Sequence, residues 1–201
     1  MVTFNPTSAF IRNDGFSDVV TSTFDPGLLH TDFNSPATRI LIQDMSIFGV
    51  IPLGSVIDSA FLELDKTEGS VNNVSVHQVI TSWDESTVTW NNFNGGGVSG
   101  VDYVATAGAV YSPGTSDSGV NQIDVTSIVQ AWSSGATNNG FYLINDGMDG
   151  VTYRSNNATM GAVPKLTVNY SHASVPEPSA FVLFGLIASV YGLRRFKRRS
   201  K

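Results

Sequence analysis

The residues with the most evident chemistry in this sequence are Trp83, Asp84, Glu85 and Trp90. Indole rings can stack on sugar rings, and carboxylates accept hydrogen bonds from sugar hydroxyls. A glycosidase would need the two carboxylates at a set separation across a cleft, but adjacent residues of a strand point to opposite faces. The favoured alternative is that Trp83 and Trp90 pack the edge of the fold, since large aromatics mostly serve cores, and that the Ser and Thr residues between them shape a turn.

A second group of carboxylates surrounds a turn in the string Asn145-Asp-Gly-Met-Asp-Gly150. Asp146 and Asp149 offer the hard oxygen ligands that suit Ca²⁺, so calcium is a candidate cofactor here. The string lacks the extended alternation and the distal Glu of an EF-hand loop. A plain Asp-Gly hairpin turn explains it equally well.

Few other residues suggest a reaction. Tyr153, on a predicted strand, is a third candidate sugar contact beside Trp83 and Trp90. The histidines, His30, His77 and His172, do not have the spacing of a metal site, and no Ser-centred nucleophile elbow occurs. The chain has no Cys, which excludes a disulfide scaffold and a thiol nucleophile. The sequence therefore predicts a protein that is not an enzyme.

The charges divide the chain into two unlike parts. Before Ser174 the chain carries 5 basic and 16 acidic residues, which leaves a net charge of −11. A body this acidic is not expected to bind nucleic acid, because binding to the phosphate backbone depends on clustered Lys and Arg. The other basic residues form a C-terminal cluster: Arg194, Arg195, Lys197, Arg198, Arg199 and Lys201. Such a cluster is suited to an anionic membrane face.

The C-terminal segment predicts a linker followed by a membrane helix. Pro176 and Pro178 end the preceding domain, so residues 171–179 are the expected linker. Residues 180–193 are apolar and uncharged, and a helix extended by Pro178, Ser179 and the stems of Arg194 and Arg195 comes close to spanning a bilayer. The basic end of segment 180–201 should stay in the cytoplasm, with the body outside. By length alone, a buried helix of a soluble domain is the alternative.

The order Pro176-Glu177-Pro178, short apolar helix and Arg-rich end resembles the PEP-CTERM sorting signal of Gram-negative bacteria. The resemblance implies recognition by an exosortase-type membrane transpeptidase, which cuts near the motif. The chain would then lie in the inner membrane during sorting and afterwards at the cell surface or in the extracellular matrix. Such proteins also carry an N-terminal secretion signal, and the residues after Met1 show no basic start followed by an apolar run.

The body, residues 1–170, reads as short strands separated by Gly, Asn, Ser and Pro. Alternation and β-branched residues predict strands at 8–12, 39–43, 59–64, 73–79, 101–106, 121–125, 140–145, 151–154 and 165–170. Their spacing predicts an all-β fold, an antiparallel β-sandwich. Asp124 to Ser127 can cap a single short helix that runs to about Trp132, with Gly135 ending it.

Several strings in this body resemble the DNRLRE domain, a jelly-roll-type β-sandwich similar to some carbohydrate-binding modules. They begin at Pro52, Val76, Ile123, Asn139 and Pro164, and the most distinctive is Trp83-Asp-Glu-Ser-Thr-Val-Thr-Trp90. The resemblance implies polysaccharide binding in some members and no catalysis by the domain itself. Residues 43–49 depart from the usual pattern.

Three functions follow from these patterns. The leading hypothesis is an exported, non-enzymatic surface or exopolysaccharide-matrix protein that binds polysaccharide through aromatic and short polar side chains. The alternative is a structural matrix or adhesion protein without a glycan site. A polysaccharide-cleaving enzyme is the third, and the scarcity of His, Lys and Arg in the body counts against it.

Overall fold

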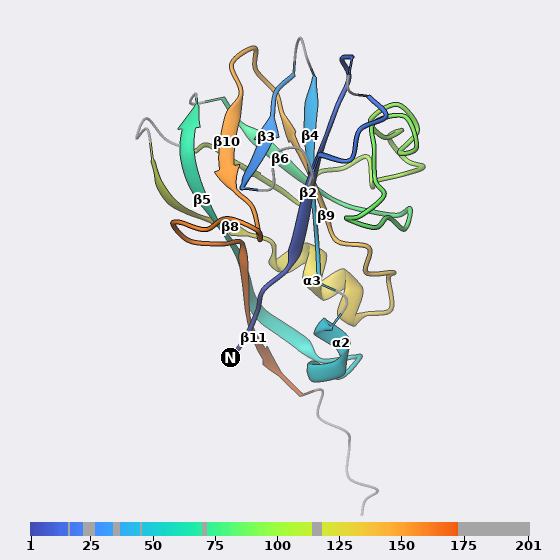
Figure 1. The fold of residues 1–201 in the computed structure, drawn as a ribbon. Coiled ribbons are helices and arrows are strands. Elements are labelled where there is room, and N and C mark those ends of the chain that lie inside the picture. The colour runs from blue at the N-terminus through green and yellow to red at the C-terminus, as the bar shows by residue number, and fades with distance from the viewer. Residues whose placement is uncertain are drawn as a thin grey trace, which may run out of the picture.

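The computed structural model describes residues 1–15, 17–21, 27–33, 37–44, 46–69, 72–113 and 118–172. Over these ranges the chain forms two antiparallel sheets, with two short helices toward one end of the molecule (Figure 1). The all-β sandwich predicted from the sequence is therefore confirmed.

The first sheet is built around one long strand, β5 (Val56–Gly69). One edge of β5 pairs with β11 (Lys165–Ser171) and then with β10 (Val151–Arg154), while the other edge pairs with β8 (Gly119–Asp124). The outer strands are β1 (Val2–Phe4), which pairs with β11, and β3 (Leu28–Thr31), which pairs with β10. Every other described strand of this sheet thus depends on β5, directly or through one neighbour.

The second sheet has the strand order β2-β4-β9-β6-β7. Its strands are β2 (Thr7–Arg12), β4 (Thr38–Gln43), β9 (Phe141–Asn145), β6 (Val74–Gln78) and β7 (Ala109–Tyr111). The chain crosses between the sheets several times, so each sheet contains strands from both halves of the sequence.

Alternating apolar residues on facing strands form the core between the sheets. On β5, Leu62 and Leu64 are fully buried, as the alternation predicts, while Phe61 on the opposite face is only partly buried. The second sheet contributes Ile40, Ile42 and other side chains that belong to the same cluster as Leu62. Hydrophobic burial on both sheets therefore fixes the register of the strands.

The predicted helix is present as α3 (Thr126–Ser133). The N-cap residue is Val125, which makes no side-chain cap; just before it, the Asp124 carboxylate accepts hydrogen bonds from the backbone N–H (3.0 Å) and the hydroxyl (2.6 Å) of Thr126, the first helical residue. Trp132 is 1% exposed and lies 4.8 Å from the ring of Phe141, centroid to centroid. A second short helix, α2 (Ile47–Val50), lies in the segment whose sequence departed from the expected pattern.

Four parts of the predicted strand pattern are wrong. Three short strands, β1, β3 and β7, were not expected, because each has fewer than five residues and no clear alternation. Residues 101–106 do not form a strand, and only Tyr103 makes isolated bridges there. This segment lies in a long loop over the outer face of the second sheet, where Tyr103 packs against the sheet without regular strand pairing and Val101 is exposed.

The C-terminal predictions fall on residues that the structure does not describe. In the described ranges, no helix is both long and apolar enough to cross a membrane. The expected membrane helix and basic cluster, 180–201, and the Pro-Glu-Pro motif lie outside the described residues.

The core arrangement predicts a large stability difference between two truncations in the first sheet. Leu62→Ala removes a fully buried side chain between the sheets and should lower the free energy of unfolding by about 2–5 kcal/mol. Val120→Ala, on edge strand β8 where the side chain is 52% exposed, should lower it by less than about 1 kcal/mol. Urea unfolding measures both, and equal losses would contradict this description of the core.

Candidate functional site

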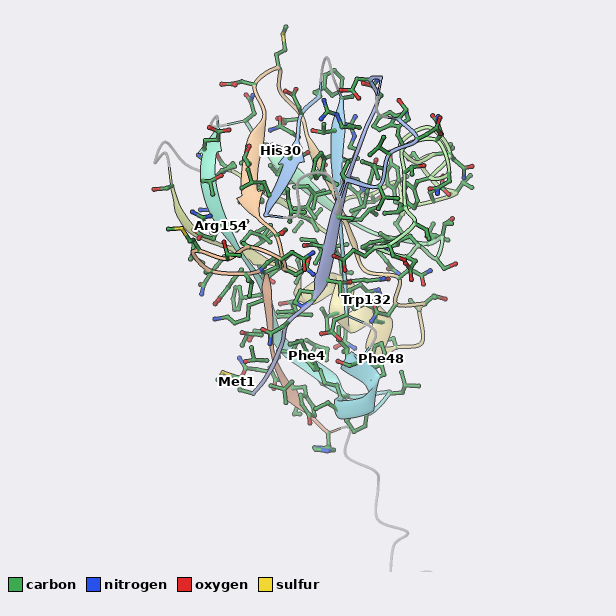
Figure 2. All side chains as sticks on the ribbon, in the orientation of Figure 1. Met1, Phe4, His30, Phe48, Trp132 and Arg154 are labelled. Atoms are coloured by element: carbon green, nitrogen blue, oxygen red, sulfur yellow. The ribbon has the colours of Figure 1, made fainter. Side chains whose placement is uncertain are left out.

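The most polar hollow described here lies at one end of the sandwich and has a volume of about 480 Å³. We call it the end pocket. It forms where β2, β3 and β5 end and where β4 and β10 begin. Its polar lining residues include Arg12, His30, Asp32, Thr38, Glu68 and Asp149. Figure 2 shows His30 at this end, well separated from Phe48 and Trp132 at the helical end.

The two sheets meet at a corner beside the end pocket. Beyond β3, Asp32 bridges to Thr38 of the second sheet, with backbone hydrogen bonds of 3.2 and 3.0 Å. Arg39 Nη1 also donates to the backbone oxygens of Asp32 (2.6 Å) and Thr38 (2.8 Å). The corner therefore holds residues of both sheets in fixed positions around the hollow.

A chain of hydrogen bonds links polar side chains inside the end pocket. His30 Nδ1 lies 3.0 Å from the hydroxyl of Thr152, and this hydroxyl makes a longer contact of 3.5 Å with Glu68 Oε1. The edge of the His30 ring packs against Phe10, with ring centroids 4.9 Å apart. These contacts hold His30 of β3 and Glu68 of β5 in defined positions on either side of Thr152 on β10, the strand between them.

Thr38 differs from the other hydroxyl residues of the pocket. Its side chain is part of the lining and the residue is 5% exposed, yet Oγ1 has no hydrogen-bond partner among the residues that the structure describes. A buried hydroxyl without a partner costs roughly 1–3 kcal/mol. Because Oγ1 is also sealed from solvent, a ligand in the pocket would reach it only if the lining moved.

An aromatic side chain lies next to the pocket in sequence. Phe33 follows Asp32 directly and is 53% exposed, which is unusual for such a large apolar ring. Exposed aromatic rings of this kind can stack on sugar faces. The sequence analysis did not select Phe33, and its only signal was its position beside a carboxylate in a segment rich in turn residues.

The segment Asn145 to Gly150 is not the hairpin turn that the sequence allowed as one explanation. It joins β9 of the second sheet to β10 of the first, so it carries the chain across the sandwich. Asn145 Oδ1 accepts a 2.8 Å hydrogen bond from the Gly147 N–H, and the Asn72 side-chain amide donates to the Asp149 carbonyl at 3.0 Å. A Cβ at Gly147 would lie 1.9 Å from the Asn72 side chain, so a larger residue there would displace the Asn72 amide from its hydrogen bond to Asp149.

The structure separates the two carboxylates predicted as calcium ligands. Both Asp146 and Asp149 are exposed, but Asp149 is part of the pocket lining and Asp146 is not. Across the described ranges, no group of three or more His, Cys, Asp or Glu residues is placed to hold a metal ion. Instead, Asp149 joins Asp32 and Glu68 around the pocket, a grouping that sequence spacing could not indicate.

Trp83 and Trp90 lie away from the end pocket, in a cluster on the outer face of the second sheet. Both are partly buried there, and we call this group the outer cluster: Ala9, Ile11, Leu41, Val79, Val88, Phe93 and Tyr142, with Trp83, Trp90, Tyr103 and Ile144 packed against them. Trp83 Nε1 donates a 2.9 Å hydrogen bond to the Asn139 carbonyl. These contacts hold the loop over residues 79–108 against the sheet.

The carboxylates between the tryptophans also make contacts within the fold. Asp84 accepts a 2.8 Å hydrogen bond from the Ser86 N–H, and hydrogen bonds from the Ser86 hydroxyl and N–H lower the pKa of Asp84. Glu85 accepts hydrogen bonds from the side-chain amides of Asn156 (3.2 Å) and Asn157 (3.0 Å). Asp84 thus shapes a turn, whereas Glu85 ties the loop to the segment after β10.

Tyr153, the third predicted sugar contact, is 0% exposed and lies between the sheets. Its hydroxyl is hydrogen-bonded to that of Tyr111 from the other sheet. Burial raises the pKa of both phenols. A sugar on the surface of this structure cannot reach Tyr153, because the side chain points to the core face of β10.

The residue that anchors the outer loop is Asp102, which the sequence analysis missed. It is 0% exposed, and its carboxylate accepts hydrogen bonds from the Thr81 hydroxyl (2.8 Å), the Asn94 amide (2.8 Å) and the Val98 N–H (2.7 Å). Burial raises its pKa, but these hydrogen bonds together outweigh that effect and lower the pKa.

Asp102→Asn should destabilise the protein by about 1–3 kcal/mol, because an amide group would then face buried donors. Since the folded-state pKa of Asp102 is lowered, its stabilisation is present above the carboxyl pKa of the unfolded chain, about 4, and is lost as the pH falls through the folded value. The stability gap between the native protein and Asp102→Asn should therefore narrow below about pH 4. Urea unfolding of both proteins above and below about pH 4 measures this difference in stability, with the exposed variant Asp58→Asn as a control. A difference that does not change with pH would contradict the prediction.

Comparison with known proteins identifies the domain. Among curated proteins, no sequence matches this chain. The sequence model of carbohydrate-binding module family 96 matches residues 48–170, from α2 to β11. That range covers more than half of the chain and includes Glu68, Asp149 and Thr152 of the end pocket. The chain therefore belongs to carbohydrate-binding module family 96.

Proposed function

We propose that this protein binds polysaccharide through the end pocket and is sorted to the bacterial surface or extracellular matrix by its C-terminal segment, without catalysing a reaction. The observation that carries the binding proposal is the match of residues 48–170 to a family of carbohydrate-binding modules. Modules of this kind are generally non-catalytic, which is why we propose binding without a reaction. The end pocket has a polar lining that includes Glu68, Asp149 and Thr152 of the matched range, and its other polar lining residues come from the chain before residue 48.

Several side chains of the end pocket suit a sugar. Asp32, Glu68 and Asp149 provide carboxylate oxygens that can accept hydrogen bonds from ligand hydroxyls. Phe33 offers an exposed ring beside them for contact with the apolar face of a sugar. Volumes of roughly 300–1,000 Å³ are typical of small-ligand sites, and the end pocket falls in this range.

The position of the last described strand, β11, also supports a surface role. Strand β11 ends beside the start of β5, where Ser171 pairs with Val56, and Tyr170 contacts the α2 residue Val50. The end pocket lies at the other end of β5, at Glu68 and Gly69. Figure 1 shows that the two ends of β5 lie far apart along the molecule. A chain held in a membrane through residues after 172 would thus present the pocket away from the bilayer.

The sorting proposal rests on the sequence. Pro176, Glu177 and Pro178 would be recognised by an exosortase-type transpeptidase in the inner membrane. The apolar run would enter the lipid, and the basic cluster at 194–201 would stay in the cytoplasm. Cleavage near the motif would then release the sandwich to the cell surface or to the matrix of a Gram-negative bacterium.

Binding is tested by affinity electrophoresis in gels that contain neutral, acidic or amino-sugar polysaccharides. At least one polymer should retard the native chain, and Glu68→Gln should weaken its binding about ten-fold or more, the equivalent of one hydrogen bond to a charged group. Glu63→Gln, on the same strand but outside the end pocket, is the matched control and should bind normally. Equal effects of both variants, or no retardation in any gel, would contradict the proposal.

Sorting is tested by expressing the full coding sequence, with its native upstream region, in an exosortase-containing host. Replacing Glu177 and Pro178 by Ala should leave the protein uncleaved in the inner-membrane fraction, while the linker control Ser174→Ala should be processed normally. Fractionation and mass measurement distinguish the two forms. Release of both variants at the same rate would show that the Pro-Glu-Pro motif is not the recognised signal.

A further inference from the structure

The helical end of the sandwich carries exposed apolar side chains in a segment without charge. Val50 is 49% exposed, Leu53 67% and Val56 51%. They lie at the end of α2, on the turn that follows it and at the start of β5, and we call these three residues the apolar tip. Residues 46–57 contain no Asp, Glu, Lys, Arg or His, although the body as a whole is strongly acidic. Three aliphatic groups thus meet water with no charged neighbour in their own segment.

The apolar tip is held in a fixed shape from its inner side. Ile47 and Ile51, which lie between α2 and the turn, are fully buried in the core. The Gly54 N–H donates a 2.8 Å hydrogen bond to the carbonyl of Ser133 on α3, and the Ser133 hydroxyl donates a 2.7 Å hydrogen bond to the Ser55 carbonyl. Because the turn is anchored in this way, the tip cannot bury its side chains by folding back onto the sandwich.

The apolar tip lies beside the end of the described chain. Ser171, the last residue of β11, pairs with Val56, and the Tyr170 hydroxyl contacts the Val50 carbonyl at 3.5 Å. Figure 1 shows α2 and the end of β11 at the same end of the molecule. Tyr170 is itself partly buried, and tyrosine is enriched where proteins meet lipid headgroups. An anchor after residue 172 is therefore attached next to the tip.

The length of chain beyond His172 limits the distance between the tip and such an anchor. Seven residues, 173–179, separate His172 from the uncharged apolar run 180–193. Even a fully extended chain of this length spans less than about 30 Å. With the apolar run in lipid, the tip is confined to this distance from the hydrocarbon, and confinement raises its effective concentration at the bilayer. A small apolar contact is then sufficient for docking.

Two exposed apolar residues elsewhere show the more ordinary situation. Val120 lines a hollow together with Glu63 and Lys165, and Met148 directly precedes Asp149 in the chain. Single exposed aliphatic side chains of this kind are normal on a protein surface. The apolar tip differs from them because three such side chains fall in one uncharged segment at the point where the chain leaves the sandwich.

We propose that the apolar tip docks on the outer surface of the bilayer that holds the C-terminal segment. Its three aliphatic side chains enter the boundary between headgroups and acyl chains, and Tyr170 lies at the level of the headgroups. This inference rests on the proposed membrane anchoring of residues 180–193 and adds the orientation of the sandwich on the membrane. Docking also keeps Pro176, Glu177 and Pro178 at the membrane surface, where a membrane-embedded transpeptidase can reach them.

The charges near the tip specify which lipids it needs. Between Arg39 and Lys66 the chain has no Lys or Arg, so the tip offers no cation to an anionic headgroup. Asp58, two residues after Val56, is exposed and accepts a 3.3 Å hydrogen bond from the Ser171 hydroxyl. The tip therefore binds neutral lipid through apolar contact, and neither anionic lipid nor high salt should strengthen or weaken its docking.

The absence of Cys from the chain allows a single probe to be placed beside the tip. Gly49 is exposed and a Cβ there would meet nothing within 4 Å, so Gly49→Cys can carry a fluorophore. The labelled full chain is reconstituted into phosphatidylcholine vesicles that contain a spin-labelled lipid, which quenches fluorophores on contact. The probe beside the tip should be quenched, whereas the same probe at Met148→Cys, next to the end pocket, should not.

A polar-tip variant separates docking from simple proximity to the anchor. It combines Val50→Thr, Leu53→Gln and Val56→Thr, and it should lower the ratio of docked to undocked chains at least about ten-fold, because three aliphatic side chains lose their contact with lipid. A matched control replaces three apolar residues that are exposed elsewhere: Val110→Thr, Val120→Thr and Met148→Gln. This control should dock as the native chain does, and thermal unfolding establishes that both variants are folded.

The outcomes distinguish this inference from the proposed anchoring. A full chain that floats with the vesicles while its Gly49 probe stays unquenched overturns docking and leaves the membrane segment standing. A chain that does not float contradicts both. Quenching that requires anionic lipid, or that the control loses as strongly as the polar-tip variant, also overturns the proposal. So does a dimer in detergent that only the polar-tip variant disrupts, because the tip is then an interface between two copies.

Discussion

Strand β5 is the constraint on which the rest of the structure depends. Its 14 residues pair with β11, β10 and β8, and through β11 and β10 they position β1 and β3. Its inward side chains, among them Leu62 and Leu64, lie in the core between the sheets. Strand β5 is hydrogen-bonded along both of its edges and also fills part of the core. A shift in its pairing register would therefore displace Glu68, and with it β10 and β3, whose residues line the end pocket.

The protein buries apolar surface in two places, and this determines which aromatic residues remain available. The core between the sheets takes Tyr153 and Trp132, and the outer cluster takes Trp83, Trp90 and Tyr142. Most of the large rings are therefore used to hold sheets, helix and loop together. The side chains that remain available for ligand recognition are mainly polar. This agrees with the proposed site, the end pocket, whose lining is rich in carboxylates and hydroxyls.

The sequence predicted those strands and the helix whose positions depend on residues close together in the chain. The alternation of Ala60, Leu62 and Leu64 indicated the buried face of β5, and Asp124 correctly indicated the start of α3. Other features depend on distant neighbours. The Asp-Gly turn after Asn145 looks the same whether it closes a hairpin or crosses between sheets, and only the pairing of β9 and β10 decides between them.

The candidate site could not be predicted from sequence for the same reason. Its residues come from β2, β4, β5, β10 and the end of β3, and no spacing along the chain reveals that these ends converge. Asp102 was missed because its partners Thr81, Asn94 and Val98 are brought to it by an irregular loop. Tyr153 was misassigned because strand alternation does not show which of its two faces meets the other sheet.

The position of β11 has a consequence for how strongly such a protein can hold a polymer. The tail leaves beside α2, at the opposite end of the sandwich from the end pocket. If the C-terminal segment holds copies side by side at a membrane before cleavage, as proposed above, their pockets lie on the side away from it, and one long chain of repeating sugars can engage several of them at once. Avidity can then exceed the affinity of a single site by about 10²–10⁴-fold, and a pocket of modest individual strength is sufficient to retain a matrix at a crowded surface.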